Sequence, residues 1–161
     1  MNTLVYIETT IPSFYYEIRT EPDMIARRDW TRQWWNSRRH HYTLVTSGAV
    51  LEELNCGNYP NQDKAIALLE EVTLLSTTSL IIEIVNTYIN HRLMPKNPTG
   101  DALHLALASY HRCDFLLTWN CQNLANANKF RHIEHINKGL GLAVPLLVTP
   151  VQLLEGDDND K

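Results

Sequence analysis

The sequence is poor in cysteine and has no long apolar run. Its three cysteines are an odd number without C-x-x-C spacing, which argues against a disulfide framework and a zinc ribbon. No apolar segment approaches the roughly 20 residues that a membrane-spanning helix needs. The start, MNTLVYIETT, lacks a basic region followed by an apolar stretch and a cleavage site. We therefore expect a cytoplasmic protein with no membrane association.

Glycine and net positive charge are also scarce. The six glycines form neither G-x-x-x-x-G-K nor G-x-G-x-x-G, so no phosphate-binding loop of either kind is present. The formal net charge of −4 is unlike that of a protein covered with basic groups for nucleic acid. A nuclease can still be acidic, because metal-binding carboxylates lower the charge while basic groups gather elsewhere. An acidic tail at 155–161, which we expect to be disordered, contributes much of the imbalance.

Short apolar runs alternate with segments of helical periodicity along the chain. This order predicts an α/β protein with a central parallel sheet between two layers of helices, in one domain spanning 1–154. Ligands of such sheets bind beyond the carboxyl ends of the strands, where the strand order reverses. The expected strands are Leu4–Ile7, Tyr42–Thr46, Val72–Leu75, Phe115–Thr118 and Leu146–Thr149, and the expected helices are Pro22–His40, the segment after Ser47, Gln62–Glu71, Ser79–His91 and Asp101–His111. A turn is expected at Thr9, Thr10 and Pro12, and a polar loop at Asn123, Asn126 and Asn128, followed by a weak basic cluster of Arg131, His132 and Lys138.

Acidic residues follow these strands or open these helices. Glu8 comes directly after the first strand, where a carboxylate is costly to hold without a partner. Glu53 lies in the helix after the second strand, and Asp101 opens the helix before the Phe115 strand. Carboxylate oxygens are the ligands that Mg²⁺ and Mn²⁺ prefer. Together these acids predict a metal site that hydrolyses phosphodiesters with metal-activated water.

Four segments carry a resemblance to a known family. YIETTIPS, VLEELNCG, GDALHLALASYHRCD and LLTWN are similar, in order and spacing, to the motif regions of PIN domains, particularly of VapC-like proteins. The resemblance covers nearly the whole chain. It implies a three-layer α/β/α PIN-like fold and a ribonuclease that depends on Mg²⁺ or Mn²⁺.

The resemblance assigns site residues position by position. It implies Glu8, Glu53 and Asp101 as metal-binding acids. Glu8 departs from the usual Asp and reaches one methylene further. Glu53 is preferred to Glu52, because neighbours in a helix point about 100° apart. The fourth acidic position falls on Asn120, which adds an oxygen but no charge, so three carboxylates and one tightly held metal are expected.

Several other residues have two interpretations. Thr10, His104 and Asn123 are candidates for substrate binding, although His104 could equally be an ordinary helix histidine and Asn123 a turn residue. Asp114 could replace the acid missing at position 120 or only turn the chain. The Arg and Trp residues of Pro22–His40 could bind RNA. Alternatively, Trp30 and Trp34 could pack in the core or at an oligomer contact, with the arginines as a solvated face.

Two functions from different classes remain open at this point. The first is a metal-dependent endoribonuclease that binds RNA; the VapC resemblance adds a toxin role, an antitoxin protein and a homodimer. The second is a catalytically weak or inactive scaffold that binds RNA or a partner protein, and it is motivated by the departures at Glu8 and Asn120.

Overall fold

The computed structural model describes residues 2–97 and 99–154, so the predicted acidic tail lies outside the described residues. A five-stranded sheet forms the centre, with neighbouring strands parallel and in the order β3-β2-β1-β4-β5. This confirms the predicted α/β class and its parallel sheet. The strands are β1 (Thr3–Ile7), β2 (Tyr42–Ser47), β3 (Thr73–Leu75), β4 (Phe115–Leu117) and β5 (Leu146–Val148).

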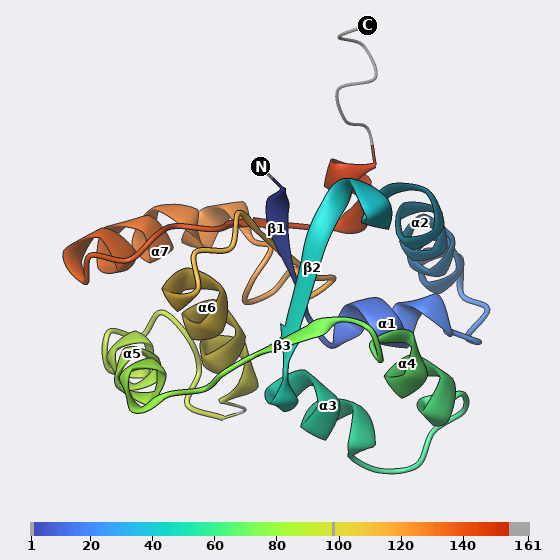
Figure 1. Cartoon of the computed structure of the whole chain (residues 1–161), viewed down its shortest axis with the longest axis horizontal. Helices are drawn as coiled ribbons and strands as arrows, with labels where there is room; N and C mark the ends of the chain where they lie inside the picture. The colour runs from blue at the N-terminus through green and yellow to red at the C-terminus, as the bar shows by residue number, and fades with distance from the viewer. Residues whose placement is uncertain (1, 98, 155–161) are drawn as a thin grey trace, which may run out of the picture.

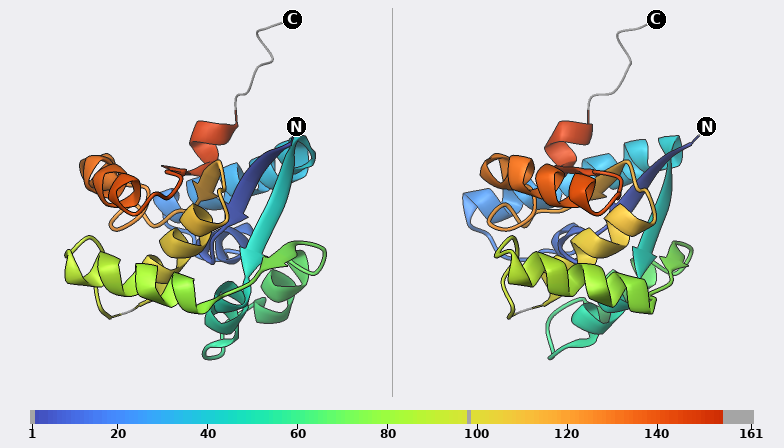
Figure 2. Two further views of the ribbon diagram at one scale, coloured as in Figure 1. Left: turned by 60° about the vertical axis from the view of Figure 1, so that its left-hand side comes forward. Right: turned by 90° about the vertical axis from the view of Figure 1, so that its left-hand side faces the viewer.

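Helices cover both faces of the sheet and make the three layers (Figure 1). Helices α1, α2 and α4 lie on one side of the strands, and α5, α6 and α7 lie on the other, where they come forward in Figure 2. Helix α3 continues directly from β2. The bounds are α1 Thr10–Tyr15, α2 Pro22–Arg38, α3 Gly48–Asn55, α4 Gln62–Leu68, α5 Ser79–Asn90, α6 Gly100–Tyr110 and α7 Ala127–Gly139, with 3-10 turns at Arg39–His41 and Pro150–Leu153.

Strand β1 lies in the middle of the sheet and is enclosed on both faces. Val5, Tyr6 and Ile7 are fully buried, which explains why the strand is a continuous apolar run rather than an alternating one. Glu8 leaves this strand at its carboxyl end, and its backbone N–H donates to the Leu117 carbonyl of β4 at 3.2 Å. The chain after β1 goes to β2, whereas β4 lies on the other side of β1. The β1–β4 boundary is therefore the point where strand order reverses.

Helix α6 is buried on nearly every side. It packs against α5, α3 and β4, and buries polar as well as apolar side chains. A charged or polar group in such a place needs hydrogen-bond partners, so its polar residues should be tied to neighbouring elements. Its buried residues are Asp101, Ala102, His104, Leu105, Ala106, Leu107, Ala108 and Ser109.

Two helices were not predicted from the sequence. Helix α1 begins immediately after β1, where only a turn was expected, and α7 occupies a region that was interpreted as a polar loop with a basic cluster. The other predicted elements are present, with ends that differ by up to three residues. None of the helices that the structure describes is long and apolar enough to cross a membrane.

Candidate active site

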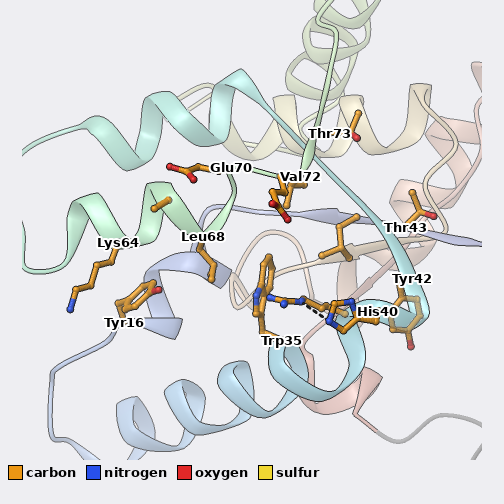
Figure 3. A pocket seen from close by; sticks show the side chains of 14 residues that line it. Tyr16, Trp35, His40, Tyr42, Thr43, Lys64, Leu68, Glu70, Val72 and Thr73 are labelled. Atoms are coloured by element: carbon orange, nitrogen blue, oxygen red, sulfur yellow. Dashed lines mark hydrogen bonds between the residues drawn. The ribbon is translucent and has the colours of Figure 1, made fainter.

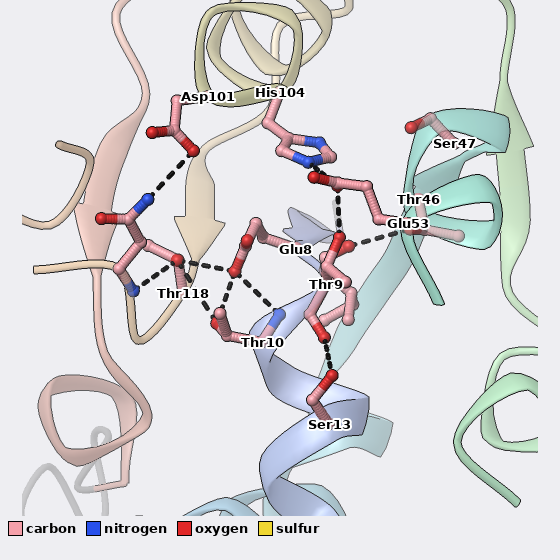
Figure 4. A network of polar contacts seen from close by, with 12 residues as sticks. Glu8, Thr9, Thr10, Ser13, Thr46, Ser47, Glu53, Asp101, His104 and Thr118 are labelled. Carbon is pink, nitrogen blue, oxygen red and sulfur yellow. Dashed lines mark hydrogen bonds and ion pairs between the residues drawn. The ribbon is translucent and has the colours of Figure 1, made fainter. Parts of the chain in front are cut away.

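Glu8 is anchored by hydroxyl and amide donors at the carboxyl ends of β1 and β4. One of its oxygens, Oε1, accepts hydrogen bonds from the backbone N–H of Thr10 at 3.0 Å, from the Thr10 hydroxyl, and from Thr118 Oγ1 at 2.7 Å. The side chain is almost fully buried, with 4% exposure. Figure 4 shows the carboxylate at the centre of this network. Thr10 and Thr118 thus fix the orientation of a buried acid.

The turn after β4 is tied to the same threonines. Thr118 Oγ1 accepts the N–H of Asn120 at 2.9 Å, and Thr10 Oγ1 accepts the N–H of Trp119 at 2.8 Å. Because both hydroxyls also bond Glu8, the loop following β4 and the segment following β1 are held as one unit. The predicted substrate-binding residue Thr10 therefore acts here as a positioning residue for Glu8.

Asp101 lies in the first turn of α6 and pairs with amides from the loop after β4. Its Oδ1 accepts Asn120 Nδ2 at 3.0 Å, and its Oδ2 accepts Asn123 Nδ2 at 2.8 Å. The Lys129 ammonium of α7 donates to Asn123 Oδ1 at 3.1 Å and to the Leu93 carbonyl at 3.1 Å. The predicted residues Asp101, Asn120 and Asn123 thus come together, supported by a lysine that sequence reasoning did not select.

Glu53 reaches the site from α3 and ends a buried hydrogen-bond chain. Its Oε1 accepts Thr9 Oγ1 at 2.6 Å and pairs with His104 Nε2 at 2.5 Å. The other ring nitrogen of His104 bonds Tyr6 Oη at 2.7 Å, and Tyr6 Oη bonds Ser47 Oγ at 2.7 Å. His104 therefore links a strand residue to the acid from α3, and is not an isolated helix histidine.

The charges around His104 favour its imidazolium form. Burial by itself lowers the pKa of His104, but the hydrogen bond with Glu53 and the negative charges of Glu8, Glu53 and Asp101 outweigh it, so the pKa is raised. Burial likewise acts to raise the pKa of Glu53, whose side chain is 40% exposed, but its contacts with His104 and Thr9 lower it overall. All three predicted acids thus act electrostatically on one buried ring.

Glu8 has the opposite balance. Burial raises its pKa, and the charge of His104 and the hydrogen bonds from Thr10 and Thr118 oppose this effect only in part. Among the described residues, Glu8 forms no ion pair. A buried carboxylate without a contacting cation favours the binding of one.

The oxygen atoms of this site are of the kind that binds a divalent metal ion. Glu8, Asp101 and Asn120 offer the hard oxygen atoms that Mg²⁺ and Mn²⁺ take, and among the described residues neither Glu8 nor Asp101 forms an ion pair. Within the described residues, no group of three or more His, Cys, Asp or Glu side chains is arranged as the ligands of one ion. The three-carboxylate metal site therefore stays a prediction, and the partners present here are amides, hydroxyls and His104.

Glu52 and Asp114 are the two acids whose part in the site the sequence did not decide, and both lie outside this network. Glu52 is exposed, one helical position from Glu53. Asp114 accepts the N–H of Leu4 at 2.8 Å, at the amino end of β4, whereas the site lies beyond its carboxyl end. Asp114 therefore only links the beginnings of two strands. Sequence reasoning missed Tyr6, Thr9 and Thr118, although all three stand inside the motif segments, within two residues of assigned positions.

The larger cavities of the surface lie mostly away from these acids. A pocket of about 730 Å³ is bounded by the beginning of β2 and the ends of α2 and α4, on the opposite end of the sheet from Glu8 (Figure 3). A second pocket, of about 440 Å³, reaches the site only through Glu53. The pocket of about 730 Å³ is lined by residues that include Tyr16, Trp35, Arg39, Tyr42, Lys64 and Glu70.

Comparisons with known proteins add no relative. No protein-family model matches the sequence, and no curated protein matches it significantly. The argument for a function therefore rests on the geometry described above and on the resemblance of the four motif segments.

Proposed function

We propose that the protein is a metal-dependent endoribonuclease of the PIN type, with Mg²⁺ or Mn²⁺ as its cofactor. One observation carries the proposal. Three carboxylates from separate segments, Glu8, Glu53 and Asp101, lie in polar networks at the carboxyl edge of the sheet, where strand order reverses. Ligand sites of parallel sheets occur at this edge, and the collected negative charge suits a divalent cation more than a free phosphate.

The residues of the site have separable roles under this proposal. Glu8 and Asp101, with the amide oxygen of Asn120, would hold the cation. Bound there, the cation supplies Lewis acidity toward a phosphate oxygen and lowers the pKa of the attacking water. Glu53 is held by Thr9 and His104, and so keeps a negative charge beside the site. Asn123, positioned by Lys129, offers its amide group to the substrate near Asp101.

The finer biological role rests on the resemblance alone. Similarity to VapC-like proteins supports a cytoplasmic toxin whose partners are an antitoxin protein and a second copy of the chain. These partners belong to the proposal and not to the observed geometry. The catalytic claim can be tested without them.

A PIN-like scaffold is the second candidate, and a specific observation favours it. Both oxygens of Asp101 accept asparagine amides, and Glu53 pairs with His104, so these acids are already engaged by the protein itself. A scaffold would bind RNA or a partner protein through the same face without cleaving. RNA binding that persists without any Mn²⁺-dependent thermal shift would support this function over the nuclease.

Asp101→Asn is the most direct test of cleavage. The substitution keeps the shape of the side chain but removes its charge, so we expect at least a 100-fold slower cleavage of mixed single-stranded RNA in Mn²⁺. Glu52→Gln is the matched control, because it removes one exposed acid beside the site, and it should cleave like the wild type. Cleavage by Asp101→Asn at the wild-type rate would overturn the proposal.

A further inference from the structure

Two tryptophans from distant segments stack beside the acidic network. Trp30 of α2 lies over Trp119, which follows β4, with ring centroids 6.2 Å apart and planes inclined by 24°. Trp119 is 7% exposed, whereas Trp30 is 40% exposed. One face of the Trp30 indole therefore rests on a buried ring, and the residue keeps 40% of its surface exposed to solvent.

The buried ring of the pair is held rigidly. Trp119 Nε1 donates to Thr31 Oγ1 at 2.7 Å, and the Phe14 ring packs against it at a centroid distance of 6.1 Å. Its backbone N–H donates to Thr10 Oγ1, whose hydroxyl in turn bonds Glu8. A base stacked on Trp30 would therefore be connected to the catalytic carboxylate through a short series of fixed contacts.

A positive charge accompanies the stacked rings. The Arg27 guanidinium lies 5.4 Å from the Trp119 ring centroid and 5.7 Å from that of Phe14, on the same helix as Trp30 and one turn before it. Among the described residues, Arg27 forms no ion pair. Its N–H groups are thus available for an anion, while the rings keep its plane in position.

We propose that Trp30 and Arg27 form a nucleotide subsite for single-stranded RNA. A base stacks on the open face of Trp30, and Arg27 binds a neighbouring phosphate. Stacking of this kind needs an unpaired base, which favours single-stranded RNA over a duplex. This inference rests on the proposed function for its substrate, because it identifies how the same site would hold the RNA chain.

Binding of a mixed-sequence single-stranded RNA, measured by anisotropy in EDTA, tests the subsite apart from cleavage. Loss of one base–aromatic stack should raise the Kd of Trp30→Ala about 5- to 150-fold. Trp30→Phe keeps a smaller ring and should recover part of the affinity. Leu74→Ala, which truncates an exposed apolar residue on the far edge strand β3, should bind like the wild type.

Tryptophan fluorescence gives a second readout in the unmodified protein. The other three tryptophans, Trp34, Trp35 and Trp119, are 0%, 2% and 7% exposed, so acrylamide should quench mainly Trp30. Saturating single-stranded RNA should protect the emission from acrylamide, and duplex RNA should not. Equal Kd values for Trp30→Ala and Leu74→Ala, absence of RNA binding by the wild type, or protection only by a protein partner would each overturn the subsite.

The two proposals fail in different ways. If the wild type cleaves RNA in Mn²⁺ while Trp30→Ala has unchanged Kd and KM, the subsite is wrong and the nuclease stands. If Trp30→Ala loses RNA affinity but the wild type does not cleave, the subsite is supported and the nuclease fails.

Discussion

Gly100→Ala should disturb the site by displacing one carboxylate. A Cβ at position 100, the first residue of α6, would lie 2.7 Å from Glu53 Oε2, closer than real Cβ contacts. The carboxylate cannot rotate away freely, because Thr9 and His104 hold its other oxygen at 2.6 and 2.5 Å. We therefore expect the substitution to break at least one of these two hydrogen bonds.

The expected change in the free energy of unfolding of Gly100→Ala is the difference between two opposing contributions. A hydrogen bond to a charged group contributes about 1.5–3 kcal/mol, and we discount this to about 1–2 kcal/mol because Glu53 is 40% exposed and water can replace the donor. Replacing glycine by alanine returns about 0.4–1 kcal/mol through the unfolded state. The net loss is therefore between zero and about 1.6 kcal/mol, which lowers Tm by up to roughly 6 °C for a chain of this size.

Gly48→Ala is the matched control for this variant. Gly48 is also the first residue of a helix, α3, but a Cβ there meets nothing within 4 Å. Its Tm should stay equal or rise, whereas Gly100→Ala should lose stability, lower the pKa of His104 in an NMR titration, and slow RNA cleavage. The same Tm and the same His104 pKa in both variants would refute the reasoning.

Three further predictions concern charge and buried polar groups. Glu8→Gln should abolish cleavage, yet raise the Tm of the metal-free protein increasingly as pH rises above 4.5, the ordinary pKa of the group, because burial raises the pKa of Glu8 and its ionisation destabilises the fold. Tyr88→Phe should cost about 1–3 kcal/mol in denaturant unfolding, because it removes the donor that Asn137 Oδ1 accepts at 2.6 Å inside the core. The His104–Glu53 pair should contribute most between pH 4.5 and 6.5, the ordinary pKa values of the two groups. Its contribution is lost as pH rises through the raised pKa of His104 or falls through the lowered pKa of Glu53, and a His104→Ala comparison across pH measures this.

The sheet was predictable because its strands are short apolar runs, but two helices were not. Helix α1 contains Pro12, which we took as part of a turn. Pro12 is the third residue of the helix, where its missing N–H would have no partner within the helix in any case. In α7, the asparagines interpreted as a loop include the N-cap: the Asn126 side chain accepts the Asn128 N–H at 2.9 Å. In both segments, residues that often form turns belong instead to the first turn or the cap of a helix.

The site was predictable in its positions and less so in its contacts. Parallel strands bring the segments after β1 and β2 to one edge of the sheet, which predicted Glu8 and Glu53 there, whereas Asp101 opens α6 and was assigned to the site by the motif order. The pairing of Asp101 with Asn120 depends on side-chain rotamers that a single sequence does not specify. Helical geometry indicated only that Glu52 and Glu53 do not both reach one site, and the motif resemblance selected Glu53, which the structure brings to His104.

The tryptophans show the limit of spacing arguments. Trp30 and Trp34 are four residues apart on α2, and one interpretation placed both in the core. Trp34 is fully buried and stacks on Tyr42, whereas Trp30, which stacks on Trp119, remains 40% exposed. Only the three-dimensional structure separates these two roles.

Calorimetric titration of Mn²⁺ tests the central claim most directly, with wild type and Asp101→Asn compared at the same pH and salt. The account predicts a saturable site in the wild type that is lost or at least tenfold weaker in Asp101→Asn, together with a metal-dependent rise in Tm for the wild type alone. Absence of Mn²⁺ binding by the wild type, or equal binding by both proteins, would contradict the claim that these carboxylates form a metal centre.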